Sequence, residues 1–393
     1  MSTELGSNKK VTVGMITKEW PPHIYGGAGV HVFNLVSALG ENSGISTEVH
    51  CFGPKRTDAF NYELIGEFAS VNPALKALLI GSDIASHLNR VNIAHSHTWY
   101  ANMAGYLASK MFGIPHIVTA HSLEPLRPWK AEQLGGGYQI SSWVEELAYE
   151  NADAIIAVSA GMKKDVLQAY PKVNPNKVHV ILNGINTKKF IPNSSAATLE
   201  KYGIKGEFAL FVGRITRQKG LAHLLRAWRQ VSPNYSLVLA AGSPDEPAIG
   251  AEVESLISEL SAERGNIVWL KDMLPHDELT SLLTHAKVFL CPSIYEPLGI
   301  VNLEAMACET AVVASKVGGI PEVVMDGETG LLIDFQEDHE RFESNFAAAI
   351  NQVMSDTSLA HRLGKAGRIR AIEEFGWDKV AASTIDLYRS LIK

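Results

Sequence analysis

Two glutamates separated by seven residues bound the segment Glu296-Pro-Leu-Gly-Ile-Val-Asn-Leu-Glu304. Pro297 suits the first position of a helix, and Leu298 and Val301 would give that helix an apolar face. The segment follows an apolar run typical of a buried strand, so both glutamates would lie at the carboxyl end of a strand. Open α/β sheets bind their ligands there. The spacing therefore indicates a ligand site at the start of a helix.

The amides of Gly299, Ile300 and Val301 would be unpaired donors at this helix start, directed at an anion. A diphosphate bound there would meet Glu296 on one side and Glu304 on the other. This arrangement suits a nucleotide-sugar, with sugar hydroxyls at Glu296 and ribose hydroxyls at Glu304. The simpler alternative is a pair of exposed glutamates that only favour the helix dipole.

A second anion-binding element follows a strand expected over Phe208–Val212. Gly213 opens a turn from which Arg214 and Lys219 project, just before an amphipathic helix expected over Leu221–Trp228. Arginine offers a planar fork and lysine a mobile point charge. Together they can neutralise a diphosphate without a metal ion.

Two glycines form a third element. Gly26 and Gly27 open a helix expected over Val30–Leu39, after a strand expected over Val11–Ile16. Their spacing is not that of a dinucleotide fingerprint. Glycines at such a place let the backbone approach a ligand closely, although a tight turn alone would also explain them.

Three histidines, His95, His97 and His121, lie in or directly after expected strands. Two histidines at alternate strand positions share one face and suit a metal ion. No carboxylate or thiolate stands at a matching spacing, and the chain has no Asp-x-Asp motif, so we expect no metal and no other cofactor. Ordinary structural histidines are the simpler alternative, although His97 and Tyr100 could line an acceptor site.

These motifs resemble those of the retaining GT-B glycosyltransferases of family 4. The likeness rests on the paired glutamates, the turn over Gly213–Gly220 and the segment Gly318–Val324. Within that family, three segments resemble the actinobacterial-type glycogen synthases: Lys18–His31, His95–Trp99 and Ala120–Gly137. Those enzymes transfer glucose from ADP-glucose to an α-glucan or, in some members, to glucose 1-phosphate, giving maltose 1-phosphate.

The resemblance implies two Rossmann-like domains facing a cleft, with a C-terminal helix that returns to the first domain. It implies that Glu296 holds the transferring sugar, and that Arg214 and Lys219 stabilise the leaving diphosphate. His121 would contact the donor sugar. The donor site implied in this way consists of Gly26, Gly27, Gly213, Arg214, Lys219, Leu298, Gly299, Ile300 and Glu304. Two departures, Ile24 for the lysine of a Lys-x-Gly-Gly motif and Thr98 for the aspartate of His-Asp-Trp, argue against the classical glycogen and starch synthases.

The composition is that of a globular enzyme. The chain has 393 residues, 46% of them hydrophobic, and a net charge of −7, with scattered lysines that form no basic stripe for nucleic acid. No apolar run approaches a membrane span, and the polar segment Met1–Lys10 does not read as a secretory signal. The chain has three cysteines, two of them in apolar runs, and we expect them to be buried small hydrophobes in a reducing compartment, which favours the cytoplasm. The oligomeric state stays open.

Strand-like runs alternate with amphipathic segments in two successive halves, which predicts parallel sheets with helices on both faces. We expect an N-terminal Rossmann-like acceptor domain over 1–187 and a C-terminal Rossmann-like domain for the nucleotide-sugar over 188–376. The last segment, 377–393, would form the returning helix.

The expected function is transfer of glucose from ADP-glucose, with retention of configuration, to an α-1,4-glucan, a maltodextrin or glucose 1-phosphate. The preference for adenine rests on the resemblance alone. A family 4 transferase that uses a UDP- or GDP-sugar with a sucrose-type or lipid acceptor therefore stays open. A non-catalytic carbohydrate-binding protein is a remote alternative, which the complete set of charged motifs argues against.

Overall fold

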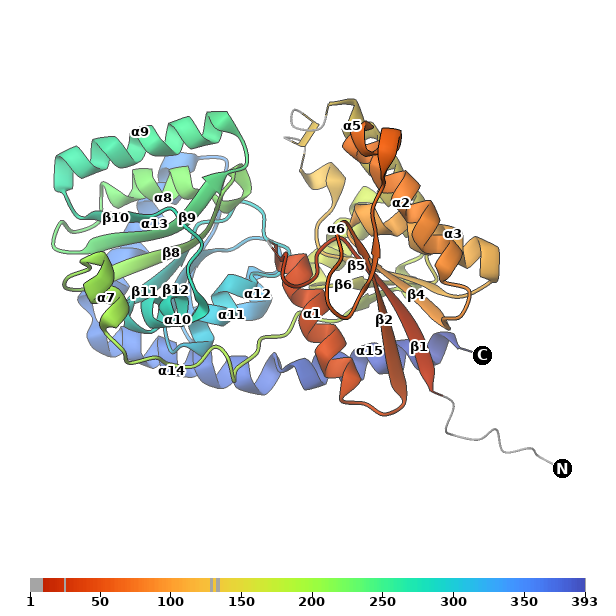
Figure 1. Cartoon of the computed structure of the whole chain (residues 1–393). Helices are drawn as coiled ribbons and strands as arrows, with labels where there is room; N and C mark the ends of the chain where they lie inside the picture. Colours follow the sequence, from red (N-terminus) through yellow and green to blue (C-terminus); the bar gives the residue numbers. More distant parts are fainter. Residues whose placement is uncertain (1–9, 25, 128–129, 132–134, 393) are drawn as a thin grey trace. The chain divides into compact units, whose positions relative to one another are not determined.

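The computed structural model describes residues 10–24, 26–127, 130–131 and 135–392 (Figure 1). Parts of the segment Ala120–Gly137, together with Tyr25 and nearly all of Met1–Lys10, lie outside the described residues. The backbone divides into two compact units. One comprises residues 1–184 and 377–393, and the other comprises residues 185–376.

The first unit is built on a seven-stranded parallel sheet with the strand order β3-β2-β1-β4-β5-β6-β7. Parallel neighbours need long crossovers, and helices supply most of them. The strands are β1 (Val11–Thr17), β2 (Ile45–Phe52), β3 (Phe60–Tyr62), β4 (Ile93–His97), β5 (His116–Ala120), β6 (Ala154–Ala157) and β7 (Val178–Val180). The helices are α1 (Gly27–Gly40), α2 (Pro73–His87), α3 (Trp99–Phe112), α5 (Gly136–Asn151), α6 (Ala160–Ala169) and α15 (Trp377–Leu391), with short 3-10 turns η1 (Gly66–Ser70), η2 (Glu124–Leu126) and η3 (Pro175–Lys177).

Alternating side chains of β1 feed two cores on opposite faces of this sheet, as the period of a strand requires. Val13 and Met15 pack with α1 and α15, whereas Ile16 packs with α2 and α3. Figure 1 shows α15 running alongside α1. The last helix, with its fully buried Tyr388, therefore completes the core of the first unit.

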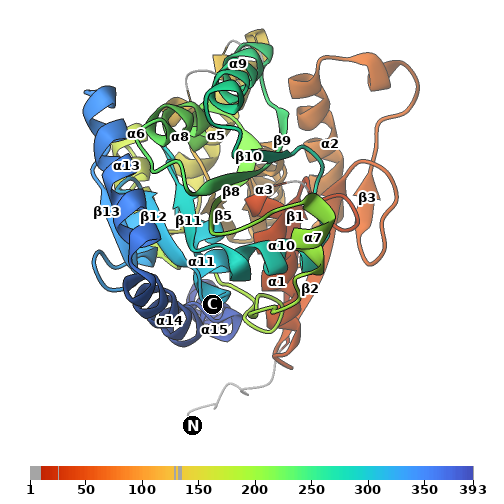
Figure 2. The same ribbon diagram turned by 90° about the vertical axis from the view of Figure 1, so that its left-hand side faces the viewer.

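The second unit has a six-stranded parallel sheet with the order β10-β9-β8-β11-β12-β13 (Figure 2). Its main core lies between the sheet and α8, α9 and α13, around Phe211, Trp228 and Phe342. The strands are β8 (Phe208–Ile215), β9 (Ser236–Pro244), β10 (Ile267–Leu270), β11 (Val288–Cys291), β12 (Ala311–Ser315) and β13 (Gly330–Ile333). The helices are α7 (Ala197–Tyr202), α8 (Leu221–Trp228), α9 (Pro247–Arg264), α10 (His276–His285), α11 (Ile300–Ala307), α12 (Ile320–Val323), α13 (His339–Ser355) and α14 (Thr357–Glu374), with the 3-10 turn η4 (Arg217–Lys219).

The predicted fold class is confirmed, since each unit is a Rossmann-like parallel sheet flanked by helices. The sequence pattern predicts strands over His116–Ala120, Ile267–Leu270 and Val288–Cys291, and these bounds agree residue for residue with β5, β10 and β11. The helix predicted over Leu221–Trp228 agrees in the same way with α8. Strand β3 and helices α2, α13 and α14 were not predicted. Among the described residues, no helix is both long and apolar enough to span a membrane.

The prediction that Pro297 opens a helix is wrong. Helix α11 begins at Ile300, and Gly299 precedes it as the N-cap with a φ of 99°. A Cβ on Gly299 would lie 2.7 Å from Nδ2 of Asn302. The chain therefore turns sharply through a left-handed glycine directly before the helix, so Pro297 belongs to the loop.

Candidate active site

Glu296 and Lys219, which belong to two separate motifs, meet in the second unit. The Lys219 ammonium lies 2.7 Å from Oε2 of Glu296, and the Ser293 hydroxyl donates to the same oxygen at 3.3 Å. Glu296 follows β11 and is 8% exposed, whereas Lys219 ends the η4 turn after β8. The two neighbouring strands β8 and β11 thus present a buried ion pair at their carboxyl ends.

Two opposing effects act on Lys219. Burial lowers its pKa, but the charge of Glu296, the nearby Cys291 and the hydrogen bond to Glu296 together keep the pKa of Lys219 above the ordinary value. The lysine is therefore a permanent cation at neutral pH. With three donors on its nitrogen, it can hold Glu296 and still bind an anion.

The segment Gly318–Val324 packs against the backbone of Glu296. Gly319 donates its amide to the Glu296 carbonyl at 2.9 Å. Gly318 has a φ of 53°, and a Cβ there would lie 2.0 Å from the same carbonyl oxygen. Only a glycine leaves room for this approach, so this motif positions the Glu296 loop.

Glu304 lies inside α11, four residues after the helix begins. Burial raises the pKa of Glu304 to about 7, against the opposing effect of the Lys219 ammonium. Near neutral pH this carboxyl group can therefore donate or accept a hydrogen bond, which suits it to a pair of hydroxyl groups.

Arg214 lies at an irregularity of β8, where the pairing with β9 shifts between Gly213 and Ile215. Such a bulge turns a side chain away from the regular sheet surface. Nη1 of Arg214 donates to both carboxylate oxygens of Asp245, at 2.9 and 3.0 Å. The arginine side chain is 55% exposed, so this pair is much more open to solvent than the pair of Lys219 and Glu296.

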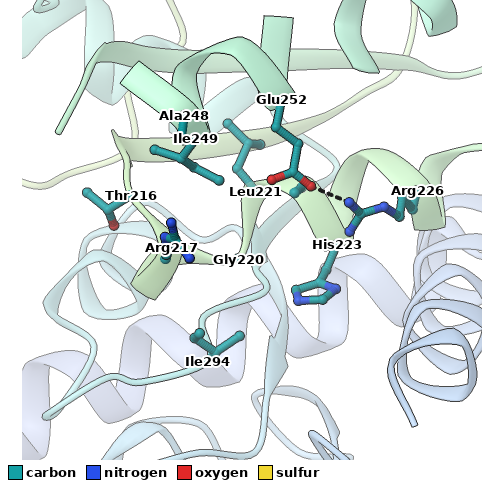
Figure 3. A pocket seen from close by; sticks show the side chains of 11 residues that line it. Thr216, Arg217, Gly220, Leu221, His223, Arg226, Ala248, Ile249, Glu252 and Ile294 are labelled. Atoms are coloured by element: carbon teal, nitrogen blue, oxygen red, sulfur yellow. Dashed lines mark hydrogen bonds and ion pairs between the residues drawn. The ribbon is translucent and has the colours of Figure 1, made fainter. Parts of the chain in front are cut away.

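A hollow of about 320 Å³ lies beside η4, between the first turns of α8 and α9 (Figure 3). Two arginines line it, but Arg226 pairs with Glu252, as the dashed line in Figure 3 shows, and Arg217 pairs with Glu246. Neither Glu296 nor Glu304 lines this hollow. This hollow is therefore not lined by the charged residues that the motifs predict for the donor site.

In the first unit, the helix start at Gly26 is already occupied by a side chain. The Gly26 amide donates to Oε2 of Glu19 at 2.8 Å. A Cβ on Gly29 would lie 2.6 Å from the Glu19 side chain. We expected Gly26 and Gly27 to let the backbone approach a ligand closely, but at least part of this close approach is made to the Glu19 side chain. Glu19 was not predicted as a site residue, although it lies in the Lys18–His31 segment that carries the family resemblance.

The histidines of the first unit form a compact cluster at the carboxyl ends of β4 and β5. His97 Nδ1 lies 3.0 Å from His121 Nε2, and the His97 ring is fully buried. His95 is structural, because its ring nitrogens bond to Tyr388 and Thr119, each at 2.7 Å. His31, which packs against His97 and His121 from α1, was not predicted as a site residue.

The two residues predicted for an acceptor site have different surroundings. His97 is inaccessible in this structure, as described above. Tyr100 is partly exposed in the first turn of α3, and the ammonium of Lys18 lies 3.8 Å from the centre of its ring. Of the two residues, only Tyr100 offers an accessible ring, and the positive charge of Lys18 lies beside it.

Two buried glutamates anchor the segment that follows His121. Glu124, in η2, accepts bonds from Arg127 and from the Ser141 hydroxyl, and its amide donates to Glu145 at 2.7 Å. Tyr170 also donates to Glu145. Burial, reinforced by the charge of Glu124, raises the pKa of Glu145 to about 7. This network was not predicted, although Glu124 and Arg127 lie in the Ala120–Gly137 segment.

Comparison with known proteins places both units in one family. Residues 25–189 match the model "Glycosyltransferase Family 4", and residues 196–370 match "Glycosyl transferases group 1". The chain is 49% identical to alpha-maltose-1-phosphate synthase of Mycolicibacterium smegmatis over 96% of its own length and 99% of the relative. It is 26% identical to a glycogen synthase of Mycobacterium tuberculosis over 95% of this chain and 93% of the relative.

The fold agrees with these matches. Sucrose-phosphate synthase from Thermosynechococcus elongatus superposes with a TM-score of 0.79, at 25% identity, over 97% of this chain and 99% of that one. The predicted family is confirmed. With near-complete coverage at 49% identity and with both halves matched, this chain belongs to the group 1, family 4 glycosyltransferases.

Proposed function

We propose that the protein is a retaining glucosyltransferase that moves glucose from ADP-glucose to glucose 1-phosphate, releasing ADP and maltose 1-phosphate. The observation that carries this proposal is the identity of 49% to an alpha-maltose-1-phosphate synthase over almost the whole of both chains. An α-1,4-glucan or maltodextrin is the second acceptor, because the chain is also related to a glycogen synthase.

The donor site of this proposal lies in residues 185–376. The diphosphate binds at the start of α11, at the amides of Gly299 and Ile300, and its charge is balanced by Lys219 and Arg214. Lys219 is held in place by Glu296 before any ligand arrives. This is the preorganised positive charge that a departing diphosphate needs, so the reaction requires no metal ion.

The two glutamates have different roles in this proposal. Glu296 holds the glucose as positive charge develops at its anomeric carbon, and Glu304 holds the ribose hydroxyls of the nucleotide. With Glu304 assigned to the ribose, no second carboxylate is assigned to the opposite face of the sugar, as a double displacement would require.

We therefore infer attack on the face from which the diphosphate departs. The bond from C1 to the phosphate oxygen breaks, and the acceptor hydroxyl forms the new bond to C1. Its proton passes to an oxygen of the leaving ADP. His121 contacts the donor sugar, and residues 1–184 receive the acceptor, with Tyr100 and Lys18 offering a ring surface and a cation. The three free cysteines are all buried, which supports a reducing cytoplasm as the compartment.

The test is a matrix of donors and acceptors with mass analysis of the products. ADP-, UDP- and GDP-glucose are each supplied with glucose 1-phosphate, a maltodextrin and glycogen. The proposal expects maltose 1-phosphate from ADP-glucose and glucose 1-phosphate, with an α linkage by proton NMR. Faster turnover with a UDP- or GDP-sugar would identify the alternative family 4 activity, and a β linkage would refute retention.

A further inference from the structure

Three imidazoles converge in the first unit from three separate elements. His31 comes from α1, His97 ends β4, and His121 follows β5. One ring nitrogen of each lies within 4.8 Å of those of the other two. The ring centres are 4.8 Å apart for His31 and His121, 5.3 Å for His97 and His121, and 5.6 Å for His31 and His97.

Two nitrogens of this cluster are buried and have no hydrogen-bond partner among the described residues. They are Nδ1 of His31 and Nε2 of His97, in side chains that are 2% and 0% exposed. Leaving a buried polar atom unsatisfied costs about 1–3 kcal/mol. In folded proteins such atoms commonly bind a water molecule or an ion.

The three rings are neutral at physiological pH, which is the form that binds a metal ion. Burial lowers the pKa of His31 to about 4, against the weaker opposing effect of the Asn183 side chain, with which the ring interacts. Burial, reinforced by the neighbouring histidines, also lowers the pKa of His97 and of His121 well below the ordinary value.

The spacing also suits tetrahedral coordination. Zinc–nitrogen bonds of 2.0–2.1 Å place two ligand nitrogens of a tetrahedron roughly 3.3 Å apart. His97 Nδ1 and His121 Nε2 are already 3.0 Å apart, as hydrogen-bonded partners. An ion between them would replace this hydrogen bond after a small separation of the rings, so His97 would coordinate through Nδ1 and its unpaired Nε2 would not be a ligand.

We propose that His31, His97 and His121 form a binding site for a divalent transition metal ion of the zinc class, with water at the fourth position. Three neutral nitrogen ligands favour zinc, cobalt or nickel over magnesium and calcium, which prefer oxygen ligands. This departs from the expectation that the chain holds no metal. We expected no metal because no carboxylate or thiolate stands at a matching spacing beside His95, His97 and His121. In the structure the third ligand is instead a histidine, His31, which comes from helix α1.

The site has a regulatory consequence that rests on the proposed function. If His121 contacts the donor sugar, an ion bound to its ring withdraws it from the sugar and slows transfer. Zinc is then an inhibitor of a reaction that itself needs no metal. Added chelator restores full turnover in zinc-treated enzyme and leaves metal-free enzyme unchanged.

The test uses the full chain, stripped with chelator and titrated with Co²⁺, whose visible absorption reports tetrahedral coordination. We expect the spectrum to saturate at one equivalent, and Zn²⁺ to displace Co²⁺, while Mg²⁺ does not. His31→Gln should abolish the signal. The matched control is His50→Gln, which removes another buried imidazole of the first unit, one whose Nε2 makes no hydrogen bond to the described residues and lies 3.8 Å from Glu48, but leaves the cluster intact.

A missing tetrahedral spectrum in the wild-type chain, or an unchanged one in His31→Gln, would overturn the proposal. If His31→Gln does not fold, His121→Gln takes its place, because that ring is only partly buried. The spectrum does not depend on turnover. A chain that binds Co²⁺ in this way but transfers no glucose from ADP-glucose would therefore refute the proposed function and leave the metal site standing.

Discussion

Lys219→Met should destabilise the second unit by much more than Arg214→Met, although both residues are proposed to bind the same diphosphate. The Lys219 and Glu296 side chains are 18% and 10% exposed, and 2.7 Å separates their charged atoms. Removing one partner of a buried ion pair costs about 3–5 kcal/mol, because the other charge remains desolvated. Since this pair keeps some access to water, we expect about 3 kcal/mol.

Arg214→Met is the matched control. Its partner Asp245 is 32% exposed, and the arginine is 55% exposed, so water solvates both groups in the variant. Exposed pairs contribute about 0–1 kcal/mol. Turnover should nevertheless fall roughly a hundredfold in both variants, because each loses one charge contact to the departing diphosphate.

A second substitution separates stability from catalysis. Glu296→Gln in the Lys219→Met background removes the unpaired charge, while the amide oxygen can still accept the Ser293 hydroxyl. The double variant should therefore regain most of the lost stability and none of the lost turnover.

The assay follows each unit separately, because a chain with two compact units need not unfold in one step. Hydrogen exchange of peptides from β11 and α11, measured over a urea series, reports the second unit, and peptides from β1 and β4 are the internal control. An equal loss of exchange protection in the β11 and α11 peptides of Lys219→Met and Arg214→Met would refute the assigned difference in stability. It is also refuted if Glu296→Gln adds to the loss instead of reversing it.

Three further predictions concern the remaining charged groups. Glu304→Gln should mainly weaken donor binding, whereas Glu296→Gln should mainly lower the single-turnover rate, since charge at the sugar matters most in the transition state. Calorimetry with ADP-glucose measures the donor affinity, and rapid quench measures the single-turnover rate. The reverse pattern in these two measurements would mean that the roles are exchanged. Activity should persist in excess EDTA, and a loss that Mg²⁺ or Mn²⁺ restores would contradict the charge balance assigned to Lys219 and Arg214. Burial and the charge of Glu124 raise the folded-state pKa of Glu145 from 4.5 to about 7, so the stability associated with its protonation is complete below pH 4.5 and is lost as the pH rises through 7. The loss of stability across this pH range amounts to roughly 3 kcal/mol. Hydrogen exchange of α5 should show stability falling with pH in the wild type and not in Glu145→Gln. An equal fall in both proteins would mean that Glu145 is not the titrating group.

The elements that were predicted correctly are those whose local pattern is complete. The β11 run Val288–Cys291 is wholly apolar because both of its faces are covered, and α8 places its apolar residues on one side of Leu221–Trp228. Periods of 2.0 and 3.6 residues are local properties of the backbone, so sequence alone shows them. Helix α2 had such a signal too, with an Asn72 cap, Pro73 and buried residues at helical spacing.

Helix α14 had a weaker signal. Its buried positions are mostly alanine and glycine, and a Cβ on Gly364 would lie 2.0 Å from the carbonyl oxygen of Glu309. Small residues that allow two backbones to pack closely are not apolar enough to mark a face. The helix is therefore specified by its neighbours more than by its own hydrophobic pattern.

The amino-acid sequence by itself determined which residue types could do chemistry here, namely Glu296 before α11 and Glu304 inside it, the basic turn after β8 and the glycines that leave space beside them. Only the tertiary structure decided their partners. Lys219 and Glu296 are 77 residues apart in the chain, and His31 joins His97 and His121 only because the fold brings this part of α1 beside the ends of β4 and β5. Side-chain pairing depends on distances of a few ångströms between distant segments, and those distances exist only after the sheets have set the order of their strands.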